Sequence, residues 1–185
     1  IPDPLWSRGL GDVYKRQARD IRQVIHKIGK DMAPGEATPA GATVDHHPKL
    51  SGQRVLVVDA NEGVRNDAHA LLERYGCIVE TAESGGEAVY MVRSSVGSES
   101  YNIIISDIHL PDFSGHQLML RLQEIMDPVP LALMTGFGYD PGHSIVKARQ
   151  AGLHPNAILY KPFRLDQLVD VCETLIDFHS DVART

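Results

Sequence analysis

Five short apolar runs alternate with five amphipathic stretches between residues 51 and 182, and this alternation restricts the fold more than any other feature. The runs are typical of strands, and several are apolar on both faces, as strands buried between two layers of helices are. Strict alternation of strands and helices predicts a doubly wound α/β domain with a parallel sheet and helices on both faces. We predict strands over 54–59, 77–81, 101–107, 130–135 and 157–161. We predict helices over 62–75, 85–93, 115–126, 144–151 and 165–181.

Glycines and serines at the expected helix ends support these boundaries. Gly76 and Gly152 stand where a helix ends and the backbone turns left-handed, and Ser84 and Ser114 stand where a helix begins. The four residues therefore predict the start or the end of four of the helices.

Composition restricts the class of protein. The 24 acidic residues outnumber the 18 basic residues, and no dense lysine and arginine cluster is present, so direct binding to nucleic acid is not expected. No apolar run approaches the roughly 18–20 residues that cross a bilayer. The two cysteines, Cys77 and Cys172, have no metal-ligand spacing and read as buried thiols. We therefore expect a cytoplasmic domain without a membrane segment in the visible chain.

The first 17 residues fit poorly with the rest of the chain, and we interpret them as non-native and disordered. The segment DVYKRQ at 12–17 can be encoded by GAT GTG TAT AAG AGA CAG, which resembles a transposon-end adaptor of sequencing libraries. A genuine N-terminal arm is the alternative. In the first interpretation the natural N-terminus is missing, and the segment does not enter the fold prediction.

Two further segments precede the α/β domain. Residues 18–32 have apolar side chains at helical spacing and predict an amphipathic helix, which we interpret as the remnant of an upstream region. Residues 33–50 are rich in proline, glycine, alanine and threonine and predict a flexible linker. His46 and His47 then belong to the linker, since two histidines without further ligands make a weak metal site.

Four polar residues of complementary chemistry end four of the predicted strands. Asp59 ends the first strand, Asp107 the third, Thr135 the fourth and Lys161 the fifth. Any one of them could simply begin a turn. Parallel strands place their carboxyl ends at one edge of a sheet, so we expect all four side chains to lie close together. Two carboxylates, an ammonium group and a hydroxyl are the groups needed to transfer a phosphoryl group to a carboxylate.

At these residues the sequence resembles the receiver domain of bacterial two-component response regulators. The resemblance covers residues 51–182 and rests on RVLVVD, IISDIHLPDFSG, LMTG and YKPF, in this order. It implies a flavodoxin-like sheet of five parallel strands in the order 2-1-3-4-5.

The resemblance also implies a role for each residue at the edge. Asp107 would accept a phosphoryl group from a phosphohistidine, Lys161 would pair with that group, and Thr135 would turn its hydroxyl toward it. Asp59, Asp107 and the backbone carbonyl of His109 would hold Mg²⁺. The peptide bond after Lys161 would be cis, as is usual in this family.

This sequence departs from the family pattern at two positions. The family has a second acid after Asp59, where Ala60 stands here, so we expect weaker binding of Mg²⁺. Asn61 or Glu62 could compensate, or either could cap the helix that follows. The second departure is Ile158, at a position that usually holds an aromatic switch residue. Tyr160 lies on the same face of the strand and could take part of that role or simply pack.

These observations favour a phosphoacceptor receiver in a two-component phosphorelay. We expect the C-terminal receiver of a hybrid kinase or of another multi-domain regulator, with a free-standing receiver as the near alternative. A histidine kinase or phosphotransfer protein would be the partner, and the fourth and fifth helices would form a homodimer. The domain would not be a metabolic enzyme, since it is itself the substrate, although it could be a fragment of a histidine kinase.

Two other classes remain as alternatives. A pseudo-receiver would bind proteins without being phosphorylated, and Ala60 favours it. A flavin- or nucleotide-binding domain is disfavoured, because DANEGVR after the first strand lacks a glycine-rich phosphate loop.

Overall fold

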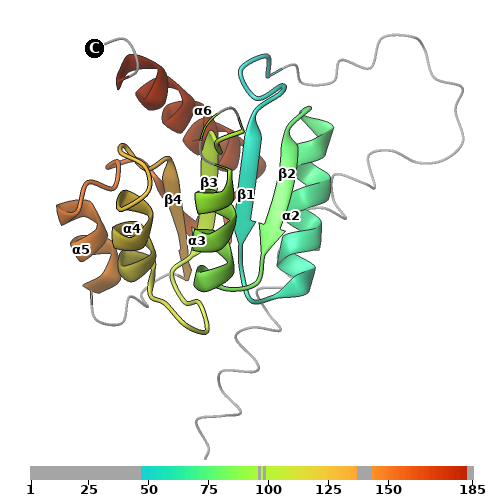
Figure 1. Ribbon diagram of the computed structural model, residues 1–185. Coiled ribbons are helices and arrows are strands. Elements are labelled where there is room, and N and C mark those ends of the chain that lie inside the picture. The colour runs from blue at the N-terminus through green and yellow to red at the C-terminus, as the bar shows by residue number, and fades with distance from the viewer. Residues whose placement is uncertain (1–46, 96, 98, 137–142, 183–185) are drawn as a thin grey trace, which may run out of the picture. The chain divides into compact units, whose positions relative to one another are not determined.

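The computed structural model describes residues 47–95, 97, 99–136 and 143–182. Within these ranges five strands and five helices alternate along the chain, as the sequence predicts. Figure 1 shows the strands side by side at the centre of the domain, with helices in front of them and behind them. The segment 1–17, the expected helix over 18–32, most of the expected linker and the loop 137–142 lie outside the described residues.

The strands form one parallel sheet in the order β2-β1-β3-β4-β5, which confirms the predicted flavodoxin-like order. The arrows of β1 and β2 point to the bottom of Figure 1, where the carboxyl ends of these strands lie. The strands are β1 (Arg54–Val58), β2 (Ile78–Ala82), β3 (Ile103–Asp107), β4 (Leu131–Gly136) and β5 (Ile158–Lys161).

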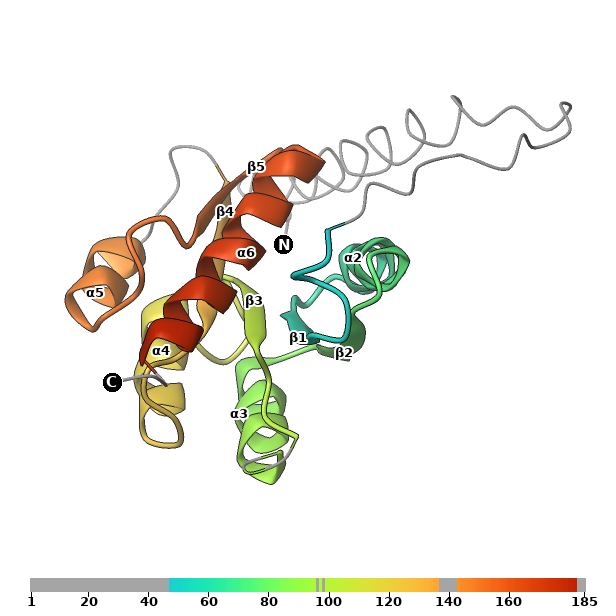
Figure 2. The ribbon, with the colours of Figure 1, turned by 90° about the horizontal axis from the view of Figure 1, so that it is seen from above.

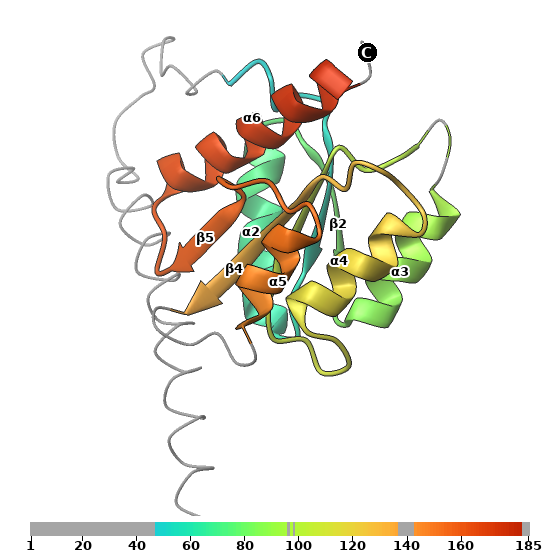
Figure 3. The ribbon, with the colours of Figure 1, turned by 90° about the vertical axis from the view of Figure 1, so that its left-hand side faces the viewer.

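The helices cover both faces of the sheet. The helices are α2 (Glu62–Arg74), α3 (Gly85–Ser94), α4 (Gly115–Gln123), α5 (Ser144–Gln150) and α6 (Leu165–Val182). Figure 2 and Figure 3 show α2 and α6 on one side of the sheet and α3, α4 and α5 on the other. This is the layering that right-handed crossovers between parallel strands produce.

Four helix ends lie at the predicted capping residues. The hydroxyls of Ser84 and Ser114 accept hydrogen bonds from backbone amides in the first turns of α3 and α4. Gly76 and Gly152 have φ values of 80° and 106°, a region that favours glycine, just past the ends of α2 and α5. Helix α4 ends at Gln123, three residues before the predicted end. The chain then turns toward Pro128, which disfavours helical backbone in the residue before it.

The central strand β3 is buried along its whole length, because it lies between β1 and β4 and between both helical layers. Each large apolar side chain buried in such a place contributes about 1.5–3 kcal/mol relative to exposure. In the register of the sheet, Asp107 pairs with Met134 and Lys161 pairs with Gly136. The core therefore fixes the strand ends that carry the predicted site residues.

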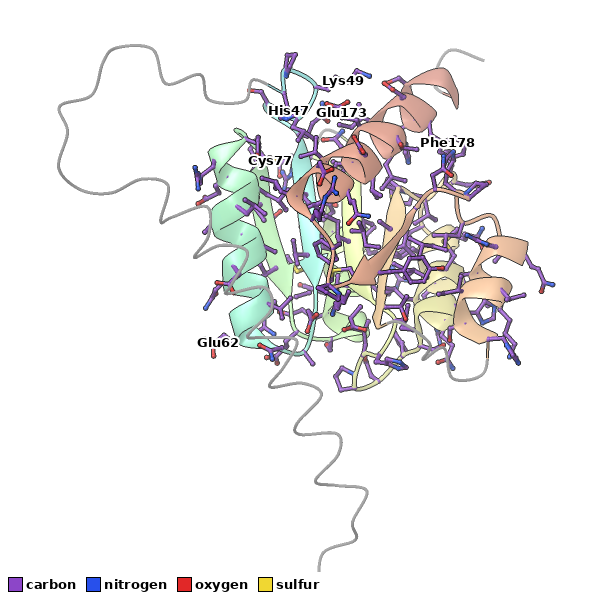
Figure 4. The ribbon with its side chains drawn as sticks, turned by 180° about the vertical axis from the view of Figure 1, so that it is seen from behind. His47, Lys49, Glu62, Cys77, Glu173 and Phe178 are labelled. Atoms are coloured by element: carbon purple, nitrogen blue, oxygen red, sulfur yellow. The ribbon has the colours of Figure 1, made fainter. Side chains whose placement is uncertain are left out.

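The first described residue is His47, within the range that the sequence assigns to the linker. Residues 47–50 form a turn, and the side chain of Leu50 is completely buried. Lys49 Nζ lies 2.8 Å from Asp177 Oδ2, and His47 Nδ1 lies 3.4 Å from Glu173 Oε1, so the turn contacts α6. Figure 4 shows His47, Lys49 and Glu173 together at one end of the domain, with Glu62 of α2 at the other end.

The apolar face of α6 is largely used inside the domain. Its buried residues include Leu168, Val169, Cys172 and Leu175. The centroid of the Phe178 ring lies 5.2 Å from the centroid of the His154 ring. The width of this face therefore does not by itself indicate a partner. In the described part of the chain, no helix combines the length and the apolar character needed to cross a membrane.

Candidate functional site

Four polar side chains are buried at the carboxyl edge of the sheet. Asp59, Asp107, Thr135 and Lys161 are each less than a tenth exposed, although polar side chains are usually at the surface. They come from β3, β4, β5 and the residue after β1. The structure therefore buries all four predicted residues at the same edge.

A single ammonium group connects the two carboxylates. Lys161 Nζ lies 2.7 Å from Asp107 Oδ2 and 3.2 Å from Asp59 Oδ2. These are charge-assisted hydrogen bonds, which are the strong ones in a protein interior. Lys161 is 102 positions from Asp59 in the sequence and 54 positions from Asp107, and the fold brings the three residues into one ionic group.

Backbone amides orient the other oxygen of each carboxylate. The amide of Asn61 donates to Asp59 Oδ1 at 2.8 Å, and the amide of His109 donates to Asp107 Oδ1 at 2.9 Å. Each carboxylate therefore has one oxygen on Lys161 and one on the loop that follows its own strand. Neither carboxylate can rotate without losing both partners.

The charges at this edge do not balance. Burial raises the pKa of Asp59 above its usual value, the charge of Asp107 raises it further, and Lys161 only partly offsets both effects. Burial alone would lower the pKa of Lys161, but the carboxylates of Asp107 and Asp59 outweigh burial and raise it. Lys161 therefore stays charged at neutral pH, and two acids face one cation.

The chemistry of these groups fits a hydrated Mg²⁺. In the ranges that the structure describes, no three His, Cys, Asp or Glu side chains group closely enough to hold a metal ion. Mg²⁺, however, commonly binds one or two carboxylates and keeps several waters. Asp59, Asp107 and the backbone carbonyl of His109 offer only oxygen donors, at an edge where two acids face one cation.

The residues that follow Ala60 lie at the start of α2. Ala60 is exposed, and the side-chain oxygen of Asn61 caps α2 by accepting from the amide of Val64 at 3.2 Å. Glu62 is the first residue of α2, where an acid favours the helix dipole. Of the two alternatives for Asn61 at this position, the structure has helix capping.

Thr135 lies at the end of β4, beside the site. Its hydroxyl donates to the carbonyl of Gly136 at 3.2 Å, and its side chain is buried. On β5, Ile158 packs against the core, whereas Tyr160 is 50% exposed. The peptide bond between Lys161 and Pro162 is cis.

Two further residues, Arg65 and Asp112, bind backbone groups near the site, and the side-chain pattern of the sequence does not predict these contacts. Arg65 Nη1 donates to the backbone carbonyl of Asp59 at 2.6 Å, and Asp112 accepts from two amides at the start of α3. Arg65 ends the segment DANEGVR, and Asp112 lies in the segment IHLPDFSG. Their partners are backbone groups, however, and side-chain patterns do not reveal which backbone groups come near.

Comparison with known proteins identifies the family of this chain. A family model described as the response regulator receiver domain matches residues 55–173. Response regulator MprA of Mycobacterium ulcerans (strain Agy99) is 30% identical over 118 residues, which cover 63% of this chain and 47% of that protein. Ethylene receptor 2 of Arabidopsis thaliana is 27% identical over 126 residues, which cover 64% of this chain and 16% of the receptor. The chain thus spans less than half the length of these curated relatives.

Solved structures show the same fold. A mutant of the receiver domain of the histidine kinase CKI1 from Arabidopsis thaliana has a TM-score of 0.56 and 28% identity, covering 69% of this chain and 91% of that one. The beryllofluoride-activated NtrC4 receiver domain dimer has a TM-score of 0.57 and 26% identity, covering 67% of this chain and 96% of that one.

Proposed function

Since this chain belongs to the family of response regulator receiver domains, we propose that it accepts a phosphoryl group on Asp107 from a phosphohistidine of a partner protein. The observation that carries the proposal is the buried contact between Lys161 and the carboxylates of Asp107 and Asp59. A buried acid held by one ammonium group and one backbone amide is an oriented nucleophile beside a fixed positive charge.

In the proposed reaction a carboxylate oxygen of Asp107 attacks the phosphorus atom of the phosphohistidine. The new P–O bond forms as the P–N bond breaks, and the electron pair of that bond returns to the imidazole of the partner. Lys161 stays protonated and balances charge on the phosphoryl oxygens, and the hydroxyl of Thr135 donates to one of them. Bound Mg²⁺, held by Asp59, Asp107 and the carbonyl of His109, would supply further positive charge.

The partner in this proposal is a histidine kinase or a phosphotransfer protein, in the cytoplasm. The relatives include a response regulator and an Arabidopsis receptor, and the solved structures include a receiver of a histidine kinase. A receiver within a hybrid kinase and a receiver of a separate regulator are both consistent with them. The NtrC4 dimer supports a homodimer. We propose that this homodimer forms through α5 and α6, and Val146 of α5 and Tyr160 of the neighbouring strand β5 are exposed.

A second candidate function is a pseudo-receiver that binds a protein partner without phosphorylation. Ala60 favours it, because the edge has one carboxylate fewer than the family pattern and the side-chain oxygen of Asn61 caps α2. Asp107, Thr135 and Lys161 favour phosphorylation, since a pure docking module has no need of a buried Lys161.

One experiment decides between the two functions. The full chain is incubated with acetyl phosphate and Mg²⁺, and an acid-labile adduct is measured by intact mass. We expect the wild type to be labelled, Asp107→Asn to remain unlabelled, and Asp170→Asn, which changes an exposed acid of α6, to be labelled like the wild type. An unlabelled wild type at high Mg²⁺ concentration would establish the pseudo-receiver instead.

A further inference from the structure

The backbone of His109 connects two parts of the proposed site. Its amide orients the carboxylate of Asp107, at 2.9 Å, and its carbonyl is the expected backbone ligand of Mg²⁺. Both groups lie in the loop between β3 and α4, residues 108–114. Whatever fixes this loop therefore also fixes the nucleophile and one metal ligand.

Hydrogen bonds within the loop hold its base. The amide of Gly115 donates to the carbonyl of Ile108 at 3.0 Å, and the amide of Leu110 donates to the carbonyl of Phe113 at 3.1 Å. His109 and Ser114 form an isolated antiparallel bridge. These bonds close the loop on itself, and the side chains of Asp112 and Phe113 at its tip, residues 111–113, contact α3 outside the loop.

The carboxylate of Asp112 fastens this tip to α3. Asp112 Oδ1 accepts from the amide of Gly85 at 2.8 Å, and Oδ2 accepts from the amide of Gly86 at 2.7 Å. Both amides belong to the first turn of α3, where amides have no partner inside the helix and the dipole favours a negative charge. Burial raises the pKa of Asp112, but these amides and others nearby outweigh burial and lower it.

Phe113 makes a second contact with the same turn. A Cβ atom on Gly85 would lie 2.4 Å from Cδ2 of the Phe113 ring, so only glycine fits at this position. The guanidinium of Arg121 lies over the ring of Phe113, 5.7 Å from the ring centroid. The tip is thus attached to α3 both by charge and by shape.

We propose that Asp112 is a positioning residue of the phosphoryl site, acting through the backbone of His109. The proposal deepens the function proposed above and rests on it. Outer partners of metal ligands fix the ligands' orientation. Because Ala60 removes one carboxylate from the edge, the carbonyl of His109 contributes a larger share of the metal site here than in a receiver with the full acidic pair.

The test compares Asp112→Ala with Ser84→Ala in the full chain. Both variants remove a cap from the first turn of α3, since the hydroxyl of Ser84 accepts from the amide of Glu87 at 3.2 Å, but only Asp112 belongs to the loop between β3 and α4. Three quantities are measured: Mg²⁺ affinity by calorimetry, the Mg²⁺ concentration for half-maximal labelling by acetyl phosphate, and amide hydrogen exchange at 108–115 without metal.

We expect Asp112→Ala to weaken Mg²⁺ binding by about tenfold or more, the usual effect of removing an outer partner, and to raise the half-maximal Mg²⁺ concentration equally. Exchange at the amide of His109 should become faster in this variant alone. Asp112→Asn keeps an acceptor for one of the two amides, so its Mg²⁺ affinity and its amide exchange rates should lie between those of Asp112→Ala and the wild type. This variant replaces Asp112→Ala in the test if the alanine variant does not fold.

Equal changes in Asp112→Ala and Ser84→Ala would overturn the inference, because Asp112 would then be only a helix cap. The failure of the proposed function gives a different result. In that case the wild type is not labelled, while calorimetry and hydrogen exchange still decide whether Asp112 positions the loop.

Discussion

Lys161 Nζ lies closer to Asp107 Oδ2, at 2.7 Å, than to Asp59 Oδ2, at 3.2 Å, so the cation favours the proposed nucleophile. Removing one partner of a buried ion pair commonly costs about 3–5 kcal/mol. We expect Lys161→Ala to lose stability in this range in urea unfolding with chelator present. Mg²⁺ should restore more stability to this variant than to the wild type, because it replaces the missing charge. Equal gains with Mg²⁺ in both proteins would contradict this explanation.

Ala60 can be replaced by the acid of the family pattern. Because Ala60 is exposed, Ala60→Asp should change stability little in the absence of metal. A charged ligand that adds about 1.5–3 kcal/mol corresponds to roughly a tenfold to hundredfold gain in Mg²⁺ affinity. Calorimetric titration measures this gain, with Ala60→Asn as a neutral control of similar size. If both variants bind Mg²⁺ like the wild type, the edge does not hold the metal as proposed.

Asn61 provides a test of compensation at the same edge. Its side-chain oxygen caps α2 through the amide of Val64, so Asn61→Ala should cost about 1 kcal/mol of stability. Mg²⁺ affinity should not change, since the oxygen is already used by the helix. Urea unfolding and calorimetry on the same sample separate the two effects. A clear loss of Mg²⁺ affinity would show that Asn61 replaces the missing acid after all.

A charged cluster at the opposite end of the sheet predicts a dependence of stability on pH. The hydroxyl of Tyr101 donates to Glu80 Oε2 at 2.7 Å and lowers the pKa of Glu80, and Arg54, at 2.6 Å, lowers it further against the effect of burial. A pKa lowered by folding gives stability above the unfolded-state pKa, and this stability is lost as the pH falls through the folded-state pKa. Glu80→Gln should therefore show a smaller loss of stability between neutral and acidic pH.

The control for this experiment is Glu124→Gln, which changes an exposed glutamate after α4. It should follow the acid unfolding curve of the wild type. If Glu80→Gln follows that curve as well, the contacts of Glu80 with Tyr101 and Arg54 do not contribute to the acid sensitivity.

Cys77 reports on the attachment of residues 47–50 to α6. Its thiol is nearly buried and donates to the carbonyl of Leu50 at 3.4 Å, and burial raises its pKa to about 11. Lys49→Glu would place a negative charge against Asp177 and weaken the attachment of the turn. We expect thiol reagents to label Cys77 several-fold faster in this variant, whereas Cys172 in the core stays unreactive. Lys147→Glu on exposed α5 is the control, and equal labelling rates in the two variants would contradict the prediction.

The sheet order and the placement of the site residues could be predicted because each depends on patterns along the chain. Apolar runs identify buried strands, and the polar residues that end them must meet at one edge of a parallel sheet. The contacts of Asp112 and Arg65 could not be predicted in this way. Both side chains bind backbone groups, and the position of a backbone amide relative to a distant side chain depends on the packed structure. The turn at residues 47–50 was assigned to the linker for a similar reason, since a single apolar residue, Leu50, carries its burial.

The ion pair between Lys49 and Asp177 also bears on the design of fusion proteins. This ion pair joins the first described turn, residues 47–50, to α6, so the two places where a host chain would be connected to the described domain lie near each other. Domains with neighbouring ends can be inserted into a surface loop of another protein with little distortion of either partner. This domain is therefore suited to insertion as a cassette, in addition to attachment at one end of a host.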